Sequence, residues 1–423
     1  MTGTTPPLSR LSSTLKMSEI VRLNGEIKER IAAGKKIHNF TIGDFDPSIF
    51  PIPTELEEEI IHAYRKHLTN YPAGEGEADL RKSVSQFIRE RQGPDYALDE
   101  ILIASGGRPL IYALFRTLCD VQDKVVYSVP SWNNYYYVDF CGSTSGVVHA
   151  EHGNDFMPTA EQLRPHLPGA RLLALCSPSN PTGTTFSREQ LEDICDLVLE
   201  ENARRGEHER KLYILFDQIY WQLTYGEIRH YDPVSLRPEL KAFTIYIDGI
   251  SKCFAATGVR VGWALGPKAV IAQMKAILSH VGAWAPLPEQ HGVSRYLMQK
   301  WSVDKNLRLF RKNLQERLQR FHTGIQQLRK EGLPVDSIVP QGAMYLTVKV
   351  DAMGRTTADG QTLEDQSAVT RYLMDGAGIA MVQFSVFGTE ANAPWYRLSV
   401  GQCKLEEIPE VLGSLKAALV KLG

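Results

Sequence analysis

Residues 171–183 read Arg-Leu-Leu-Ala-Leu-Cys-Ser-Pro-Ser-Asn-Pro-Thr-Gly, a short apolar run that leads into a turn. The run Arg171–Cys176 is apolar at successive positions, which suits a strand that is covered on both faces. Two prolines and a glycine restrict the turn that follows, where Asn180 offers a fixed amide. The stretch therefore predicts a buried strand of a parallel sheet, with polar groups at its C-terminal end.

The same pattern recurs between about Ile101 and Pro267. Helical segments, for example 109–118 and 188–201, lie between most of the apolar runs. The other runs are Ile101–Ala104, Lys124–Val129, Lys211–Phe216, Phe243–Ile247 and Arg260–Leu265. Strands that alternate with helices predict an α/β domain in which a mainly parallel sheet is covered by helices.

The segments on either side predict a second, smaller domain. A polar helix is expected over about 18–33, and residues 305–330 space their charges around Leu and Phe as one amphipathic helix does. That helix leads to an α+β part with apolar runs at 344–350 and 397–400. We expect a large domain at 48–303, a small domain made of 15–47 and 304–423, and a flexible extension at 1–14.

The composition is that of an ordinary globular protein. The 423 residues are 43% hydrophobic and 23% charged, and a formal net charge of -2 gives no general field for nucleic acid or an anionic membrane. No run of about 18 apolar residues is present, and residues 1–10 lack the apolar core of a secretory signal. The six cysteines are scattered without a Cys-x-x-Cys pair, so a reducing, cytoplasmic setting is expected. No metal is expected, because His149 and His152 lack a second ligand cluster.

Candidate functional residues follow the apolar runs, because open parallel sheets bind ligands at the C-terminal ends of their strands. Ser105-Gly106-Gly107-Arg108 follows the first run and opens a helix, where glycines let backbone N–H groups approach a phosphate. The alternative is a strand-to-helix turn without a ligand. Trp132, after the second run, can stack on a flat ring or simply cap the core.

Two further strand ends carry ionisable groups. Asp217 closes the run at 211–216, where burying a carboxylate costs free energy unless it meets a cation or a hydrogen-bond donor. A protonated ring nitrogen of a ligand would be such a partner. The alternative is that Asp217 caps a turn. Lys252 follows the run at 243–247. Partial removal from water can lower the pKa of its amine enough for the neutral form to attack an aldehyde. The alternative is that Lys252 is an ordinary surface lysine. Arg260, eight residues on, suits a phosphate. Together these are the groups that pyridoxal phosphate (PLP) demands.

Four motifs stand in a distinctive order along the chain. They are Asn180-Pro-Thr-Gly183, Asp217-Gln-Ile-Tyr220, Ser251-Lys252 with Thr257-Gly-Val-Arg260, and Tyr396-Arg397-Leu398-Ser399. With these motifs the chain resembles the class I/II aminotransferases of PLP fold type I, from about Ser18 to its C-terminus. The resemblance implies an α/β fold in which a large domain, built on a mainly parallel seven-stranded sheet, is joined to a smaller α+β domain.

The resemblance also implies how the cofactor is held. Lys252 would form the internal aldimine and later shuttle the proton between Cα and the cofactor carbon, and Asp217 would pair with the pyridine nitrogen. Asn180 and Tyr220 would hydrogen-bond the phenolic oxygen, and Trp132 would stack on the ring. The implied phosphate cradle consists of Gly106, Gly107, the Arg108 backbone, Ser251 and Arg260.

Substrate and partner contacts are implied in the same way. Arg397 would clamp the substrate α-carboxylate, with the Gly43 backbone on its other side, next to Trp132 and Asn180. Tyr71 matches the family tyrosine that reaches the phosphate from the neighbouring subunit, which implies a homodimer with shared active sites.

Arg108 bears on the choice of substrate. The closer resemblance is to the bacterial aspartate aminotransferases, which read Gly-Gly-Lys where this chain reads Gly-Gly-Arg, and whose lysine helps to bind the distal carboxylate of aspartate. Arg108 is expected to bind that carboxylate with a planar fork; the alternative is that it faces phosphate or solvent. Gly249 stands where many relatives have a phosphate-binding serine, although the aspartate-specific branch also has glycine there, and Ser251 replaces an alanine of that branch. Trp284 would place an aromatic ring near the substrate and admit aromatic amino acids.

The expected function is therefore transfer of an amino group from L-aspartate to 2-oxoglutarate by a ping-pong mechanism through the Lys252 aldimine. Three alternatives stay open: an aromatic or broad-specificity aminotransferase, a PLP-dependent β-lyase, and a binding or regulatory module that keeps the fold without catalysis. The presence of Lys252 and the absence of an added DNA-binding segment argue against the last of these.

Overall fold

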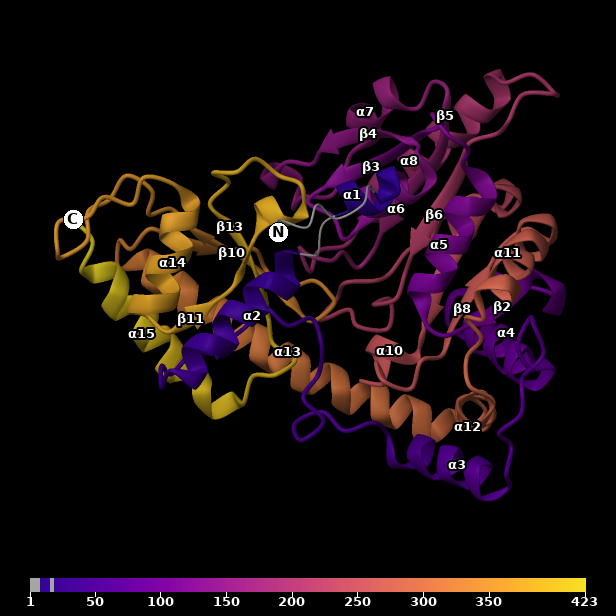
Figure 1. Cartoon of the computed structure of the whole chain (residues 1–423), viewed down its shortest axis with the longest axis horizontal. Coiled ribbons are helices and arrows are strands. Elements are labelled where there is room, and N and C mark those ends of the chain that lie inside the picture. Colours follow the sequence, from indigo (N-terminus) through magenta and orange to yellow (C-terminus); the bar gives the residue numbers. More distant parts are fainter. Residues whose placement is uncertain (1–7, 16–18) are drawn as a thin grey trace, which may run out of the picture.

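The computed structural model describes residues 8–15 and 19–423. Its centre is a seven-stranded sheet with the strand order β2-β8-β7-β6-β5-β3-β4 (Figure 1). Only β8 runs antiparallel to its neighbours β2 and β7. The strands are β2 (Ile101–Ala104), β3 (Lys124–Val129), β4 (Thr144–His149), β5 (Ala170–Cys176), β6 (Tyr213–Asp217), β7 (Thr244–Gly249) and β8 (Gly262–Leu265). The expected mainly parallel, seven-stranded α/β sheet is thus confirmed.

Each face of this sheet is covered by its own hydrophobic core, which explains the apolar runs. In β5, Leu173 and Leu175 belong to one core, whereas Leu172 and Ala174 belong to the other. The first core includes residues of helices α4 (Ala78–Gln92), α8 (Arg188–Arg204) and α12 (Leu287–Leu297). The second includes residues of helices α5 (Gly107–Leu118), α6 (Asn134–Cys141) and α11 (Lys268–Val281). Alternate strand residues point to opposite faces, so a strand covered twice must be apolar throughout.

A smaller body lies beside this sheet, at the left of Figure 1. It holds an antiparallel sheet of order β12-β13-β10-β9 and a parallel pair β1-β11. These strands are β1 (His38–Asn39), β9 (Val335–Ser337), β10 (Tyr345–Val350), β11 (Ile379–Ala380), β12 (Val382–Gln383) and β13 (Trp395–Ser399). The helices in this body are α2 (Glu19–Ala32), α14 (Gln366–Gly376) and α15 (Ile408–Val420).

Helix α13 (Lys300–Lys330) joins the two bodies along the lower edge of Figure 1. Val303 and Leu307 near its start pack in the core of the large sheet, whereas Leu314 and Leu328 pack in the core of the smaller body. Its opposite face carries charges, as the amphipathic pattern predicts. Within residues 8–15 and 19–423, no helix combines the length and apolar character needed to cross a membrane.

Several details differ from the expectations. Strand β4 lacks a continuous apolar run because it is an edge strand with exposed residues, so the sequence did not reveal it. Helix α13 begins at Lys300 rather than at 305. Within the expected flexible extension, residues 1–7 lie outside the described part, but Arg10–Thr14 form helix α1. The expected domain boundaries stay a prediction.

The chain also forms helices α3 (Thr54–Arg65), α7 (Ala160–Leu163), α9 (Pro233–Leu236) and α10 (Ile250–Cys253).

Candidate active site

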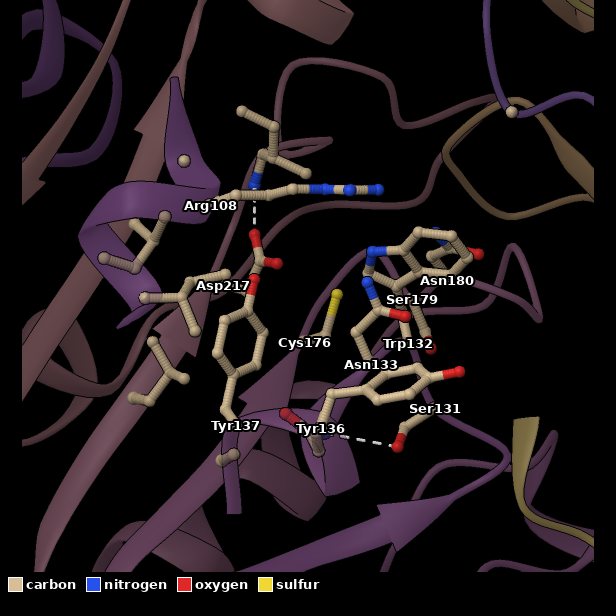
Figure 2. Close-up of a pocket in the computed structure, with 18 of the residues that line it drawn as sticks. Arg108, Ser131, Trp132, Asn133, Tyr136, Tyr137, Cys176, Ser179, Asn180 and Asp217 are labelled. Atoms are coloured by element: carbon tan, nitrogen blue, oxygen red, sulfur yellow. Dashed lines mark hydrogen bonds between the residues drawn. The ribbon is translucent and has the colours of Figure 1, made fainter. Parts of the chain in front are cut away.

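A cavity of about 970 Å³ opens at the C-terminal ends of the parallel strands. It collects residues that are far apart in the sequence, from both bodies of the molecule, and Figure 2 shows several of them. Of the predicted site residues, its wall contains Gly43, Gly107, Arg108, Trp132, Asn180, Asp217, Tyr220, Ser251, Lys252, Arg260 and Arg397. The structure therefore brings these predicted residues together around one cavity.

Lys252 projects into this cavity from α10, the short helix that follows β7. Its Nζ donates a hydrogen bond to the carbonyl oxygen of Gly43 at 2.6 Å. Removal from bulk water lowers the pKa of Lys252 to about 8; Asp44 opposes this shift and the nearby arginines, Arg397 first, add to it. About a tenth of the amine is therefore neutral at pH 7, far more than for an ordinary lysine, and the neutral amine is the form that attacks a carbonyl group.

Asp217 ends β6 in the wall of the cavity. One carboxylate oxygen accepts a hydrogen bond from the backbone N–H of Ile219 at 3.1 Å. Removal from water raises the pKa of Asp217 to about 6, and the Ile219 N–H opposes that rise. Among the described residues no basic side chain forms an ion pair with it. A cationic ligand group would stabilise this carboxylate in its charged form.

Tyr137 of α6 is a neighbour of Asp217 that the sequence did not single out. Figure 2 shows its hydroxyl pointing toward the Asp217 carboxylate. The Tyr137 side chain is buried, which raises its pKa; the Arg108 charge lowers that pKa and the Asp217 charge raises it further. One tyrosine among the three consecutive tyrosines 135–137 carries no distinguishing signal in the sequence.

Gly106 and Arg260 form a cradle at the start of α5. Arg260 donates from Nη2 to the carbonyl oxygen of Ser105 at 2.9 Å and from Nη1 to that of Thr257 at 2.7 Å. Gly106 has a φ of +91° and a ψ of 179°, a backbone conformation that strongly favours glycine, and a Cβ there would also displace the Arg260 guanidinium. Because α5 begins at Gly107, its N-terminal N–H groups and Arg260 together suit an anion such as phosphate.

Arg397 of β13 is almost fully buried, with 1% of its surface exposed. Its Nη1 donates to Asn180 Oδ1 at 3.0 Å and its Nη2 to the carbonyl oxygen of Thr41 at 2.6 Å. Its Nε has no hydrogen-bond partner, and within the described chain no carboxylate forms an ion pair with it. A Cβ on Gly43 would lie 3.7 Å from Arg397 Nη1, so Gly43 and Arg397, the two residues predicted to bind the substrate α-carboxylate, lie next to each other. A buried guanidinium with an unused donor is suited to an incoming carboxylate.

Arg108 and Arg397 lie near the same indole ring. The guanidinium carbon of Arg108 is 5.5 Å from the centre of the Trp132 ring, and that of Arg397 is 6.0 Å from it. Arg108 is exposed, and in the part of the chain that is described it has no carboxylate partner. The geometry therefore places two cations without acidic partners around one aromatic ring.

Tyr220 and Tyr345 meet beside Arg397. Their hydroxyl oxygens are 2.7 Å apart, and both side chains are buried. Tyr345 was not predicted, because a tyrosine that opens the apolar run of β10 does not show which way it faces. Asp44, which accepts a hydrogen bond from Thr257 Oγ1 at 2.7 Å, is a further wall residue that the sequence did not single out.

Tyr71 does not enter the cavity of its own chain. Its side chain is 83% exposed, and its ring meets the edge of Trp284 at a centroid distance of 5.5 Å. Its predicted reach into a neighbouring subunit stays a prediction.

Gly183 fixes the turn after β5 against β10, and substituting it by alanine is expected to destabilise the protein. Its φ is +70°, and a Cβ would collide with the backbone oxygen of Tyr345. We expect Gly183→Ala to cost about 2–4 kcal/mol of unfolding free energy, measured by denaturant titration. Gly169→Ala is the matched control, because Gly169 has a φ of +71° but open space around its Cβ position. Equal losses in the two variants would contradict this role for close packing.

Comparison with known proteins agrees with this geometry. Residues 35–415 match the family model described as aminotransferase class I and II. An aspartate aminotransferase of Rhizobium meliloti is 27% identical over 427 residues, covering 99% of this chain and 97% of that protein. A probable aspartate/prephenate aminotransferase of Rhizobium leguminosarum bv. phaseoli is 25% identical, covering 90% of this chain and 91% of its own length.

Solved structures show the same similarity. The aspartate aminotransferase of Rhizobium meliloti superposes with a TM-score of 0.89 at 25% identity, and the match covers 100% of both chains. The aspartate aminotransferase of Thermus thermophilus, solved with maleate, gives a TM-score of 0.86 at 25% identity over 98% of this chain and 100% of its own. The fold is therefore that of the PLP-dependent aminotransferases, and the chain belongs to the class I and II aminotransferase family.

Proposed function

We propose that this aminotransferase moves the amino group of L-aspartate to 2-oxoglutarate by a ping-pong mechanism, with PLP carried on Lys252. The observation that carries the proposal is the pair of guanidinium groups, Arg397 and Arg108, that flank Trp132 and form no ion pair with a carboxylate of the described residues. One suits the α-carboxylate that all amino donors share, and the other suits a second carboxylate. Both 2-oxoglutarate and aspartate carry that second group.

The residues present fit PLP. Asp217, which has no ion-pair partner in the described part of the chain, offers its carboxylate to the ring nitrogen, and Lys252 offers an amine of lowered pKa to the aldehyde. Tyr220 and Asn180 lie in the wall where they can hold the phenolic oxygen, and Trp132 can cover the ring. The phosphate would lie among Gly106, Gly107, the Arg108 backbone, Ser251 and Arg260. When bound, PLP supplies an aldehyde for amines and a ring that withdraws electrons from Cα.

The residues of the chain itself have separate roles in binding the substrate and in moving its proton. Arg397 binds the α-carboxylate and orients the substrate, because its fork is fixed by Asn180 and the Thr41 carbonyl. Lys252, once its amine is free, would take the proton from the substrate Cα and deliver it to the cofactor carbon that had carried the aldehyde, since its pKa of about 8 lies near physiological pH. The wall carries Lys252, Arg108, Arg260 and Arg397 against Asp44 and Asp217, which favours anionic ligands.

A second candidate is an aromatic or broad-specificity aminotransferase on the same scaffold. Trp132, Tyr136 and Tyr137 give the cavity an aromatic wall beside Arg108. The hypothesis of an acidic amino donor is favoured by the excess of positive charge in the cavity wall. It is also favoured by the dicarboxylate maleate, with which the Thermus thermophilus relative was solved.

Replacing Arg108 distinguishes the two candidates. We expect Arg108→Ala to lower kcat/KM for L-aspartate by roughly 10- to 150-fold, because a charged hydrogen bond to the side-chain carboxylate is lost. The kcat/KM for L-phenylalanine should stay within about threefold, because in a ping-pong reaction this ratio reports the donor half-reaction and not the step with 2-oxoglutarate. Steady-state transamination with both donors is the measurement, and Arg116→Ala, on the exposed side of the same helix, is the control. An equal loss for both donors would remove the aspartate assignment.

The lowered pKa of Lys252 predicts how fast the cofactor-free protein takes up PLP at different pH values. Only the neutral amine adds to the aldehyde, so the rate should rise with pH, reach half its maximum near the pKa of about 8, and then level off. A solvent-exposed lysine would keep gaining reactivity up to about pH 10.4. Stopped-flow absorbance of the bound cofactor gives the rate, and a continued rise through pH 10 would contradict the lowered pKa.

We further propose a homodimer in which Tyr71 reaches the phosphate site of the neighbouring copy, since it is 83% exposed and lies outside its own cavity. All six cysteines are free, which supports a reducing compartment such as the cytoplasm.

A further inference from the structure

Tyr345 contacts three parts of the site from a single position on β10. Its hydroxyl is 2.7 Å from that of Tyr220, and its ring lies under the Arg397 guanidinium at 4.7 Å. A Cβ on Gly43 would lie 2.9 Å from the Tyr345 hydroxyl oxygen. Gly43 is also the residue whose carbonyl accepts the hydrogen bond from Lys252. Tyr345 is itself 1% exposed, so its hydroxyl has little access to water.

Strand register fixes this placement. Thr347 of β10 pairs with Arg397 of β13, and Tyr345 is two residues from Thr347 on the same face of the sheet. The Tyr345 ring therefore lies diagonally beneath the guanidinium. Its backbone is held in turn by the close approach of Gly183.

The hydroxyl groups of Tyr220 and Tyr345 can each donate only one hydrogen bond. A phenol carries one proton and can both donate and accept one hydrogen bond. If Tyr220 donates its proton to the phenolic oxygen of PLP, the 2.7 Å contact can persist only with Tyr345 as donor and Tyr220 as acceptor. A hydroxyl that accepts a hydrogen bond becomes a stronger donor, because such chains polarise one another.

We infer that Tyr345 is a positioning residue for the transamination reaction: its hydroxyl donates to Tyr220 and strengthens the hold of Tyr220 on the phenolic oxygen of the cofactor, while its ring supports Arg397. The inference rests on the proposed use of PLP. Charged and ionisable groups that face the two tyrosines are Arg397, Cys176 and Asp44.

The test is a pH titration of the visible absorbance of PLP-loaded wild type, Tyr220→Phe, Tyr345→Phe and the double variant. A donated hydrogen bond favours the negative phenolic oxygen that remains when the lysine-bound nitrogen loses its proton. Weakening that hydrogen bond should raise the pH at the midpoint of the absorbance titration, by about 1 pH unit or more for Tyr220→Phe and by roughly 0.5 pH unit for Tyr345→Phe. The double variant should match Tyr220→Phe, because Tyr345 acts through Tyr220.

Steady-state kinetics separate the hydroxyl from the ring. Tyr345→Phe keeps the ring under Arg397, so KM for L-aspartate should stay near the wild-type value. Tyr345→Leu removes the ring and should raise that KM by roughly five- to tenfold, more than it lowers kcat. An unchanged midpoint in Tyr345→Phe, or shifts that simply add in the double variant, would overturn the inference while leaving PLP binding intact. Absence of a titrating visible band in wild type would overturn the proposed function as well.

Discussion

Replacing Lys252 by alanine should abolish transamination, with kcat at least about 10,000-fold below that of wild type. The variant loses both the amine that carries the cofactor and the base that moves the Cα proton. Lys252 is half-buried, and among the residues that the structure describes its Nζ donates a hydrogen bond only to the Gly43 carbonyl, so the fold itself should survive. Coupled steady-state assays with L-aspartate and 2-oxoglutarate, together with the visible spectrum after addition of PLP, measure the effect.

Lys268→Ala is the matched control for this experiment. Lys268 is a surface lysine on α11 that pairs with Asp99 at 2.7 Å and lies outside the cavity wall. Its loss should leave kcat and the visible band unchanged, because exposed ion pairs contribute little. Activity of Lys252→Ala within tenfold of wild type would show that another group performs the proton transfer.

Asp217→Asn should give the second-largest loss. The substitution keeps the size of the side chain but removes the charge that stabilises a protonated ring nitrogen. Leaving a buried cation without its partner costs about 3–5 kcal/mol, so kcat should fall by roughly 200- to 4,000-fold, and PLP should dissociate more readily. Because the pKa of Asp217 is raised to about 6 in the absence of ligand, PLP binding to wild type should also weaken as the pH falls below about 6.

Asp248→Asn controls for the loss of a buried carboxylate on the neighbouring strand. Asp248 accepts hydrogen bonds from the indole N–H groups of Trp221 at 2.8 Å and of Trp263 at 3.1 Å, and it is not in the cavity wall. This variant should lose stability yet keep the cofactor spectrum. If Asp217→Asn turned over as fast as wild type, the carboxylate would have no part in activating the ring.

The sequence was informative where one physical constraint dominates. Strands such as β5 and β6 are buried on both faces, so their apolar runs stood out, and their C-terminal ends gave the positions of Asn180 and Asp217. Lys252 and Arg260 followed from the next strand in the same way. Parallel strands that end at one edge bring such residues together, and the cavity confirms that they meet.

Residues that depend on tertiary placement were missed. Tyr345 and Tyr137 look like ordinary core aromatics. Only the placement of β10 beside the turn after β5, and of α6 on the large sheet, directs their hydroxyls toward Tyr220 and Asp217. Strand β4 escaped because an exposed edge strand needs no continuous apolar run. The short helix Arg10–Thr14 lacks the length over which a hydrophobic period can be recognised.

A single half-reaction tests the central claim most directly. PLP-loaded enzyme is mixed with L-aspartate in the absence of any oxo acid, and both the visible spectrum and the oxaloacetate formed are measured. A ping-pong aminotransferase for aspartate should lose its visible band and release one oxaloacetate per active site, then stop until 2-oxoglutarate is added. No spectral change with aspartate, or product that keeps accumulating without an oxo acid, would contradict the account.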